Sequence, residues 1–352
     1  MKKFSLLLFA LLAAGCASFK FIPADNATKI LPKTDARLTQ RAAELKAMIA
    51  KGGHNGAFLS GETVSFFGMI PDDLAKRLEM LGLNEAYVRY DRDFFADSDY
   101  ADVLSGLIAA MKRRGITVYL AVKMSDGVWK RSDNCFRRNW IDPLVDEVVK
   151  HFAPRLAGFQ EDYPEGSFDG VMFEFDMEAF DKSNLDMPPG QIYGWSDTSY
   201  GLGQDNDLLV QSGFEMLAKI KAKLAAREMK LIYGVAAPSY IPEKQAAGEL
   251  TKGSVSDFLA TADFAIFDTR ESGSNDIVRK ADALLKNAPA HKVGVWLPLS
   301  RHAETGVPAL RRRSFKQFCV GLGNVIGSCA GLPAYRGAAF DGFDALQDIW
   351  EK

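Results

Sequence analysis

Three acidic residues alternate with apolar residues in the segment from Phe168 to Phe180. Glu174, Asp176 and Glu178 take every second position, with an apolar residue between each pair. Because side chains alternate between the two faces of a strand, the three carboxylates are predicted to share one face. Burying ionised carboxylates without partners costs several kcal/mol each, so a purely structural core is an unfavourable place for them. Closely spaced carboxylates also raise one another's proton affinity, which suits general acid catalysis near neutral pH.

Strand-like and helix-like segments alternate along the whole chain around this acidic strand. The strand candidates are 57–67 (one strand or a short hairpin), 86–90, 117–122, 170–177, 230–236, 264–267, 292–298 and 338–343. Helices are expected at 36–51, 71–81, 100–114, 140–151, 208–228, 254–260, 276–286 and 314–329. Eight such units favour an α/β fold of the closed (β/α)8 TIM barrel type, with a doubly wound open sheet as the alternative. In a barrel the acidic strand comes fourth and its carboxylates face the interior, with Glu178 nearest the C-terminal mouth, whereas an edge strand would expose them to solvent.

The acidic strand resembles the fourth strand of the chitinase-like family 18 glycoside hydrolases. Asp169-Gly170 stands before Glu174-x-Asp176-x-Glu178, as Asp-Gly stands before D-x-D-x-E in that family. The resemblance implies that Glu178 is the general acid/base, that Asp176 positions the N-acetyl group of the substrate, and that Glu174 belongs to the same site. Two departures are that Glu174 replaces an aspartate and that the Asp-Gly pair stands two residues farther upstream.

The sixth predicted strand is similar to that family's M-x-Y-D sequence. Phe267 stands at the position of the tyrosine and Asp268 at that of the aspartate, which implies that both contribute to substrate binding. Asp268 could equally cap a helix. The third strand lacks the family's S-x-G-G ending and the eighth lacks an obvious floor tryptophan.

Several residues near the predicted strand ends are candidates for sugar binding, because apolar sugar faces stack on aromatic rings and polar side chains take the hydroxyls. They are Tyr90, Asp91, Tyr240 and Trp296. The long connection 181–207 adds Trp195, the favoured sugar platform, since long loops in compact domains commonly bind or cover a ligand. For each aromatic residue, rim packing is the alternative.

The N-terminus has the features of a secretory signal. Lys2 and Lys3 precede the apolar run 4–14, which is too short to span a bilayer and reads as a signal-peptide core. The following sequence, Leu12 to Cys16, resembles the lipobox of bacterial lipoproteins, with an ordinary cleaved signal as the alternative.

The lipobox resemblance implies a lipidated cell-envelope protein. Residues 1–15 would be removed, Cys16 would carry lipid and bind the membrane, 16–34 would form a tether, and 35–352 would form the barrel domain. Ser18 rather than Asp follows two places after Cys16, which favours an outer-membrane or cell-surface location in a diderm host.

Composition excludes several classes of protein. A net charge of −2 with interspersed signs gives no support for nucleic-acid binding. The four histidines are scattered and there is no CxxC sequence, so neither a metal site nor a cofactor is expected. Cys135, Cys319 and Cys329 permit one disulfide that the sequence cannot choose.

The predicted function is hydrolysis of glycans that contain N-acetylglucosamine, by an O-glycosyl hydrolase. One alternative is a non-catalytic glycan-binding barrel of the envelope. Another is a barrel hydrolase in which Glu174, Asp176 and Glu178 hold Mg²⁺ or Ca²⁺, because these cations prefer oxygen ligands.

Overall fold

The described chain contains a closed sheet of eight parallel strands. The computed structural model describes residues 36–90, 98–123, 145–146, 148–174, 207–227, 231–238, 248, 255–269, 274–286, 288–297, 299, 310 and 314–351. The chain divides into two compact units, Met1–Thr39 and Gln40–Lys352, and the sheet lies in the second. Neighbouring strands pair in chain order from β1 to β8, and β8 pairs with β1. The predicted (β/α)8 barrel is therefore confirmed, and the open sheet is excluded.

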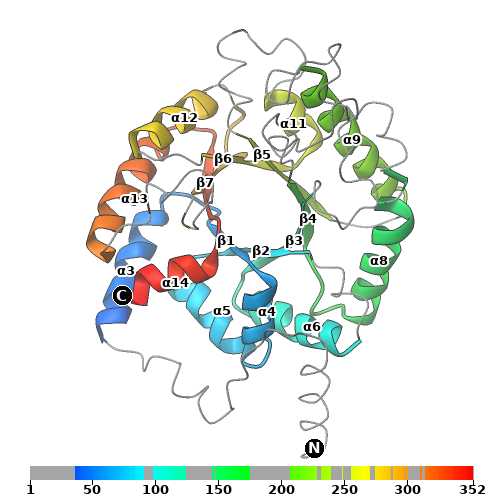
Figure 1. The fold of residues 1–352 in the computed structure, drawn as a ribbon, viewed down its shortest axis with the longest axis horizontal. Helices are drawn as coiled ribbons and strands as arrows, with labels where there is room; N and C mark the ends of the chain where they lie inside the picture. The colour runs from blue at the N-terminus through cyan, green and yellow to red at the C-terminus, as the bar shows by residue number, and fades with distance from the viewer. Residues whose placement is uncertain are drawn as a thin grey trace, which may run out of the picture. The chain divides into compact units, whose positions relative to one another are not determined.

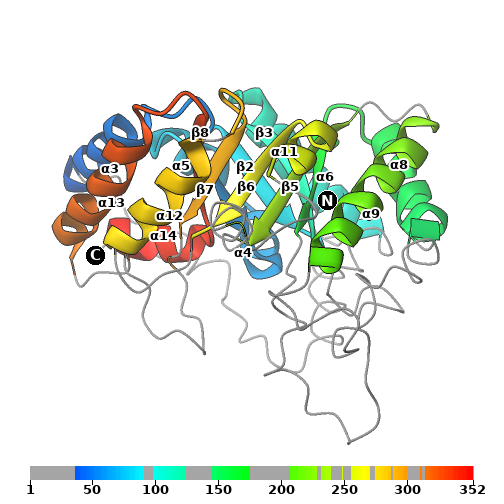
Figure 2. The same ribbon diagram turned by 90° about the horizontal axis from the view of Figure 1, so that it is seen from above.

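The strands form a ring, and the helices lie outside it (Figure 1). The strands are β1 (Gly56–Leu59), β2 (Glu85–Arg89), β3 (Thr117–Lys123), β4 (Gly170–Glu174), β5 (Ile232–Pro238), β6 (Phe264–Asp268), β7 (Val293–Leu297) and β8 (Tyr335–Phe340). The helices are α3 (Ala36–Ile49), α4 (Gly61–Phe67), α5 (Pro71–Met80), α6 (Ser98–Arg113), η4 (Val148–Phe152), α8 (Ala153–Asp162), α9 (Asp207–Ala225), α11 (Val255–Thr261), α12 (Ser274–Lys286), α13 (Phe315–Cys329) and α14 (Phe343–Glu351). Figure 2 shows the strands of the barrel from the side, between these helices.

The prediction of one strand or a short hairpin at 57–67 is wrong beyond Leu59. The chain leaves β1 and forms α4, whose N-cap Ser60 accepts a hydrogen bond from the Thr63 backbone N–H. Thr63 Oγ1 then donates to Asp344 Oδ2 of α14 at 2.7 Å. The β-branched and aromatic residues of this segment favour a strand locally, but a capped helix buries Val64 and Phe67.

Two further predicted boundaries differ from the structure. The eighth strand begins three residues earlier than expected, and α14, which was not predicted, follows it at Phe343. Half of the helix predicted at 140–151 falls outside the described residues. The described part has a short π-helix, η4, which continues into the unpredicted α8.

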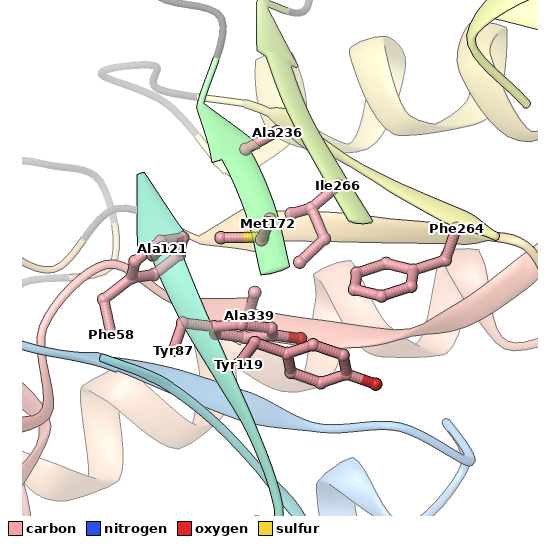
Figure 3. Packing of buried hydrophobic residues seen from close by; sticks show 9 residues of the cluster. All are labelled: Phe58, Tyr87, Tyr119, Ala121, Met172, Ala236, Phe264, Ile266 and Ala339. Atoms are coloured by element: carbon pink, nitrogen blue, oxygen red, sulfur yellow. The ribbon is translucent and has the colours of Figure 1, made fainter. Parts of the chain in front are cut away.

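The barrel interior is a packed core. Figure 3 shows the nine side chains of its central cluster, which are Phe58, Tyr87, Tyr119, Ala121, Met172, Ala236, Phe264, Ile266 and Ala339. A run of rings crosses it: Tyr87 and Tyr119 have centroids 5.6 Å apart, and Tyr119 meets Phe264 edge-on at 5.2 Å. Gly234 faces Phe264, where a Cβ would lie 2.4 Å from the ring, so only glycine leaves room for it. Layers of side chains fill the interior, as is usual in this fold.

Aspartates at the N-terminal ends of two strands join neighbouring strands. Asp169, just before β4, accepts a hydrogen bond from the Val118 N–H at 2.9 Å, and Asp263, just before β6, accepts one from the Tyr233 N–H at 2.8 Å. A Cβ on Gly170 would lie 2.3 Å from the Ile232 carbonyl oxygen. The Asp169-Gly170 pair therefore has a structural function at the start of β4, because the aspartate satisfies a strand N–H and the glycine permits close approach.

A buried ion pair lies at the N-terminal end of the barrel. Arg336 of β8 donates two hydrogen bonds to the Glu85 carboxylate of β2, at 2.7 and 2.6 Å, while Tyr87 and Tyr119 donate to the same carboxylate and His54 Nδ1 lies 3.0 Å from it. Burial raises the pKa of Glu85, but the hydrogen bonds with His54 and Arg336 and the charge of Arg336 outweigh it and lower the pKa from 4.5 to about 2. The carboxylate is thus ionised and well satisfied, which marks the pair as structural.

No helix in the described part of the chain is long and apolar enough to cross a membrane.

Cys319 and Cys329, both on α13, are free thiols, and burial raises the pKa of Cys319 to about 11 and that of Cys329 to about 12. Cys135 lies outside the described residues.

Candidate functional site

Glu174 lies at the C-terminal end of β4 and faces the barrel interior. Met172, two residues earlier, belongs to the interior cluster, and the Glu174 side chain is only 6% exposed. Val171 and Phe173, which alternate with these positions, are fully buried. The predicted alternation of faces therefore holds through the described part of this strand. Asp176 and Glu178 lie outside the described residues.

A basic residue that the sequence analysis missed lies beside this carboxylate. Arg89 ends β2, and its Nε is 3.7 Å from Glu174 Oε1. The guanidinium carbon lies 5.1 Å from the centre of the Phe58 ring, a cation–π distance. β2 and β4 are both neighbours of β3, and the register pairs Arg89 with Ala121 and Glu174 with Lys123. The pairing of the strands brings Arg89 and Glu174 together, although they are far apart in the sequence.

An aromatic pair extends this site across the barrel. Phe58 of β1 stacks on Trp296 of β7, with centroids 4.5 Å apart and planes at 17°. The Trp296 Nε1–H is buried and has no hydrogen-bond partner in the part of the chain that the structure describes. Because a buried unpaired donor costs free energy, this N–H is a candidate for bonding an acceptor atom of a ligand. Trp296 was predicted from sequence as a substrate-binding residue, whereas Phe58 was not.

The other predicted site residues are placed separately. Tyr90 packs edge-on against Phe152 of η4 at 5.4 Å, away from the interior cluster. Phe267 is fully buried but does not belong to that cluster. Asp268 is the last residue of β6 and pairs in register with Trp296. The remaining predicted residues lie outside the described residues: Asp91, Asp176, Glu178, Trp195, Tyr240 and Cys16.

The site as described contains one buried carboxylate, one guanidinium and two stacked aromatic rings at the C-terminal ends of the strands. In TIM barrels this end carries the active site. Such a set can bind a sugar ring on its apolar face and hydrogen-bond its substituents. Among the described residues, no group of three His, Cys, Asp or Glu side chains is placed to hold a metal ion.

The sequence matches no protein-family model and no curated protein. Similar solved structures are family 18 chitinases and other glycoside hydrolase barrels. A GH18 chitinase from Pseudoalteromonas aurantia has a TM-score of 0.51 at 14% identity, covering 85% of this chain and 99% of that one. The PgaB (BpsB) glycoside hydrolase domain from Bordetella bronchiseptica has a TM-score of 0.51 at 11% identity, covering 84% and 95%. PbGH5A, a glycoside hydrolase family 5 enzyme from Prevotella bryantii B14, has a TM-score of 0.50 at 10% identity, covering 86% and 93%. At these identities the likeness shows the fold alone.

Proposed function

We propose that this chain is a glycoside hydrolase of the bacterial cell envelope that acts on glycans containing N-acetylglucosamine. The observation that carries the proposal is the position of Glu174, which faces the interior at the C-terminal end of β4. Asp176 and Glu178 follow at the same alternation in the sequence. If the strand continues in that register, these carboxylates extend towards the mouth, where barrel enzymes bind substrate.

In the proposed reaction, Glu178 donates a proton to the glycosidic oxygen as the bond to the anomeric carbon breaks. Asp176 holds the substrate acetamide so that its carbonyl oxygen attacks that carbon, which makes the substrate its own nucleophile. Water then adds to the anomeric carbon as the bond between that carbon and the acetamide oxygen breaks, which restores the acetamide, and the water gives a proton to Glu178, which restores the acid. Trp296, which is partly buried and stacks on Phe58, supplies an apolar surface for a sugar ring.

The test is turnover of a chromogenic chitobioside and of a peptidoglycan fragment by the purified full-length chain. The Glu178→Gln variant is the control, since it keeps the size of the side chain but cannot donate the proton. Release of the chromophore or of new reducing ends by the wild type alone would support the proposal. Equal turnover by both proteins would contradict the role of Glu178.

A second candidate function is glycan binding without catalysis. Phe267 stands where the resembling family has a tyrosine, but it has no hydroxyl and lies apart from the interior cluster. The acetamide pocket implied by the resemblance therefore lacks one of its groups. Tight binding of chitin oligosaccharides or of peptidoglycan without any turnover would favour this candidate.

The proposed location is the membrane surface, through lipid on Cys16. It is supported by the lipobox-like sequence from Leu12 to Cys16 and by the short apolar run before it. Labelling of the cells with a radioactive or clickable fatty acid tests it directly.

A further inference from the structure

We infer that Thr269 is a positioning residue of the proposed sugar-binding site. Its hydroxyl holds the backbone of Trp296 and thereby sets the plane of the indole ring on which a sugar lies. This inference rests on the proposed function and deepens it by naming a buried residue that acts on the substrate through Trp296.

Thr269 lies directly after β6 and is completely buried. Its Oγ1 donates a hydrogen bond to the Trp296 carbonyl oxygen at 2.7 Å, and its backbone N–H donates to the same oxygen at 3.3 Å. The backbone bond continues the pairing of β6 with β7, in which Asp268 lies beside Trp296. The hydroxyl bond is additional to this pairing, and the β-branched side chain has few rotamers, which keeps the hydroxyl in place. The Trp296 carbonyl is therefore fixed by two donors of one residue.

The other side of β7 is held by Asp341, which follows β8 and is buried. Asp341 Oδ1 accepts a hydrogen bond from the Leu299 N–H at 2.7 Å, and the Asp341 N–H donates to the Leu297 carbonyl oxygen at 3.2 Å. These bonds act beyond Trp296 in the chain, whereas Thr269 bonds the carbonyl of Trp296 itself. Because the following residues stay fixed, loss of the Thr269 hydroxyl should turn the Trp296–Leu297 peptide and tilt the indole.

The tilt of the indole matters because Trp296 stacks on Phe58, with the two planes at 17°. Phe58 is buried, and its ring packs in turn against Tyr87 with centroids 5.0 Å apart. One face of the indole is therefore covered by Phe58, and a sugar ring must use the other. Contact with a sugar depends on close, parallel approach over the whole ring, so a tilt of the indole removes part of it.

The experiment measures the dissociation constants of chitotetraose and of a peptidoglycan tetrasaccharide by calorimetry with the full-length chain. The parent protein carries Glu178→Gln, so that the proposed cleavage does not occur during the titration. In this parent, Thr269→Val and Thr269→Ala remove the hydroxyl, whereas Thr269→Ser keeps it. Thermal unfolding checks that each variant is folded.

Thr63→Val is the matched control. Thr63 is 2% exposed and its Oγ1 donates to Asp344 Oδ2 at 2.7 Å, so this variant loses a comparable buried hydroxyl bond between α4 and α14. Trp296→Ala supplies a second background, because it removes the indole but keeps the carbonyl that Thr269 bonds.

Thr269→Val and Thr269→Ala should weaken binding of the glycan roughly 3- to 10-fold, the scale of one neutral hydrogen bond. Thr269→Ser should bind as the parent does, and so should Thr63→Val, although it loses stability. In the Trp296→Ala background, Thr269→Val should change the dissociation constant by no more than about twofold, because its effect passes through the indole.

The failures are distinguishable. Unchanged binding by Thr269→Val, or the same loss with and without the indole, would overturn the positioning by Thr269 and leave the proposed function standing. Loss of folding in both hydroxyl-free variants would also overturn it, because Thr269 would then be structural. Binding of neither glycan by the parent would overturn both the inference and the proposed function.

Discussion

Replacing Arg336 by Met should destabilise the barrel strongly, because it leaves the Glu85 carboxylate buried without its cation. The Glu85 side chain is 1% exposed and that of Arg336 is 7% exposed. The pair joins β2 to β8 across β1, and β1 itself pairs with β8 only at Gly56–Ala339 and Ala57–Phe340. We therefore expect the ion pair to strengthen the closure of the barrel at its shortest seam.

The magnitude follows from the pKa of Glu85. A lowering from 4.5 to about 2 corresponds to roughly 3 kcal/mol in favour of folding, at about 1.4 kcal/mol per pH unit. Removing one partner of a buried ion pair costs about 3–5 kcal/mol, which agrees with the value from the pKa. Arg336→Met should lower the free energy of unfolding at pH 7 by that amount.

The contribution of Glu85 to stability should depend on pH. The folded-state pKa of Glu85 lies below its ordinary value, so its contribution is complete above about pH 4.5 and is lost as the pH falls through about 2. In Arg336→Met, Glu85 keeps its burial but loses the hydrogen bonds and the charge of the arginine, so the pKa of Glu85 should rise. Protonation of Glu85 at low pH should then reduce the destabilisation of the variant. The stability gap between wild type and variant should therefore narrow between pH 7 and pH 4.

Urea unfolding of the full-length chain, followed by tryptophan fluorescence at both pH values, provides the measurement. The exposed pair of Arg113 and Asp72 supplies the control: the two side chains are 62% and 75% exposed, and Arg113→Met should cost less than about 1 kcal/mol. The double variant Glu85→Gln with Arg336→Met should recover most of the loss, since no unpaired buried charge remains. A cost for Arg336→Met no larger than that of Arg113→Met would refute the reasoning.

Three further predictions concern the proposed function. Glu178→Gln should reduce turnover roughly 10²- to 10⁴-fold while leaving folding intact, and full activity of this variant would mean that another residue is the acid. Asp176→Asn should reduce turnover and shift the pH profile, which pH-dependent kinetics will show. If Trp195 is a sugar platform, Trp195→Ala should weaken glycan binding by about 1–3 kcal/mol in calorimetry. Unchanged binding would mean that Trp195 does not contact the glycan. Cys16→Ser should abolish lipid labelling and move the protein to the soluble fraction, so a variant that stays membrane-bound would refute the anchor.

The sequence predicted the barrel because its main signal is local. Alternating apolar runs and amphipathic segments repeat eight times, and each depends on neighbouring residues alone. The same local rule placed Glu174 on the inner face, since Met172 and Glu174 differ by one period of a strand. Trp296 was likewise identified by its position late in a predicted strand.

Only the tertiary structure could reveal the partners of these residues. Arg89 and Glu174 meet because β2 and β4 both pair with β3, and Glu85 and Arg336 meet because the barrel closes. The charge of Arg336 also made the start of β8 look unlike a strand, since the carboxylate that neutralises it comes from the other side of β1. Local sequence sets the period and face of each strand, whereas side-chain pairing depends on the order and register in which distant strands join.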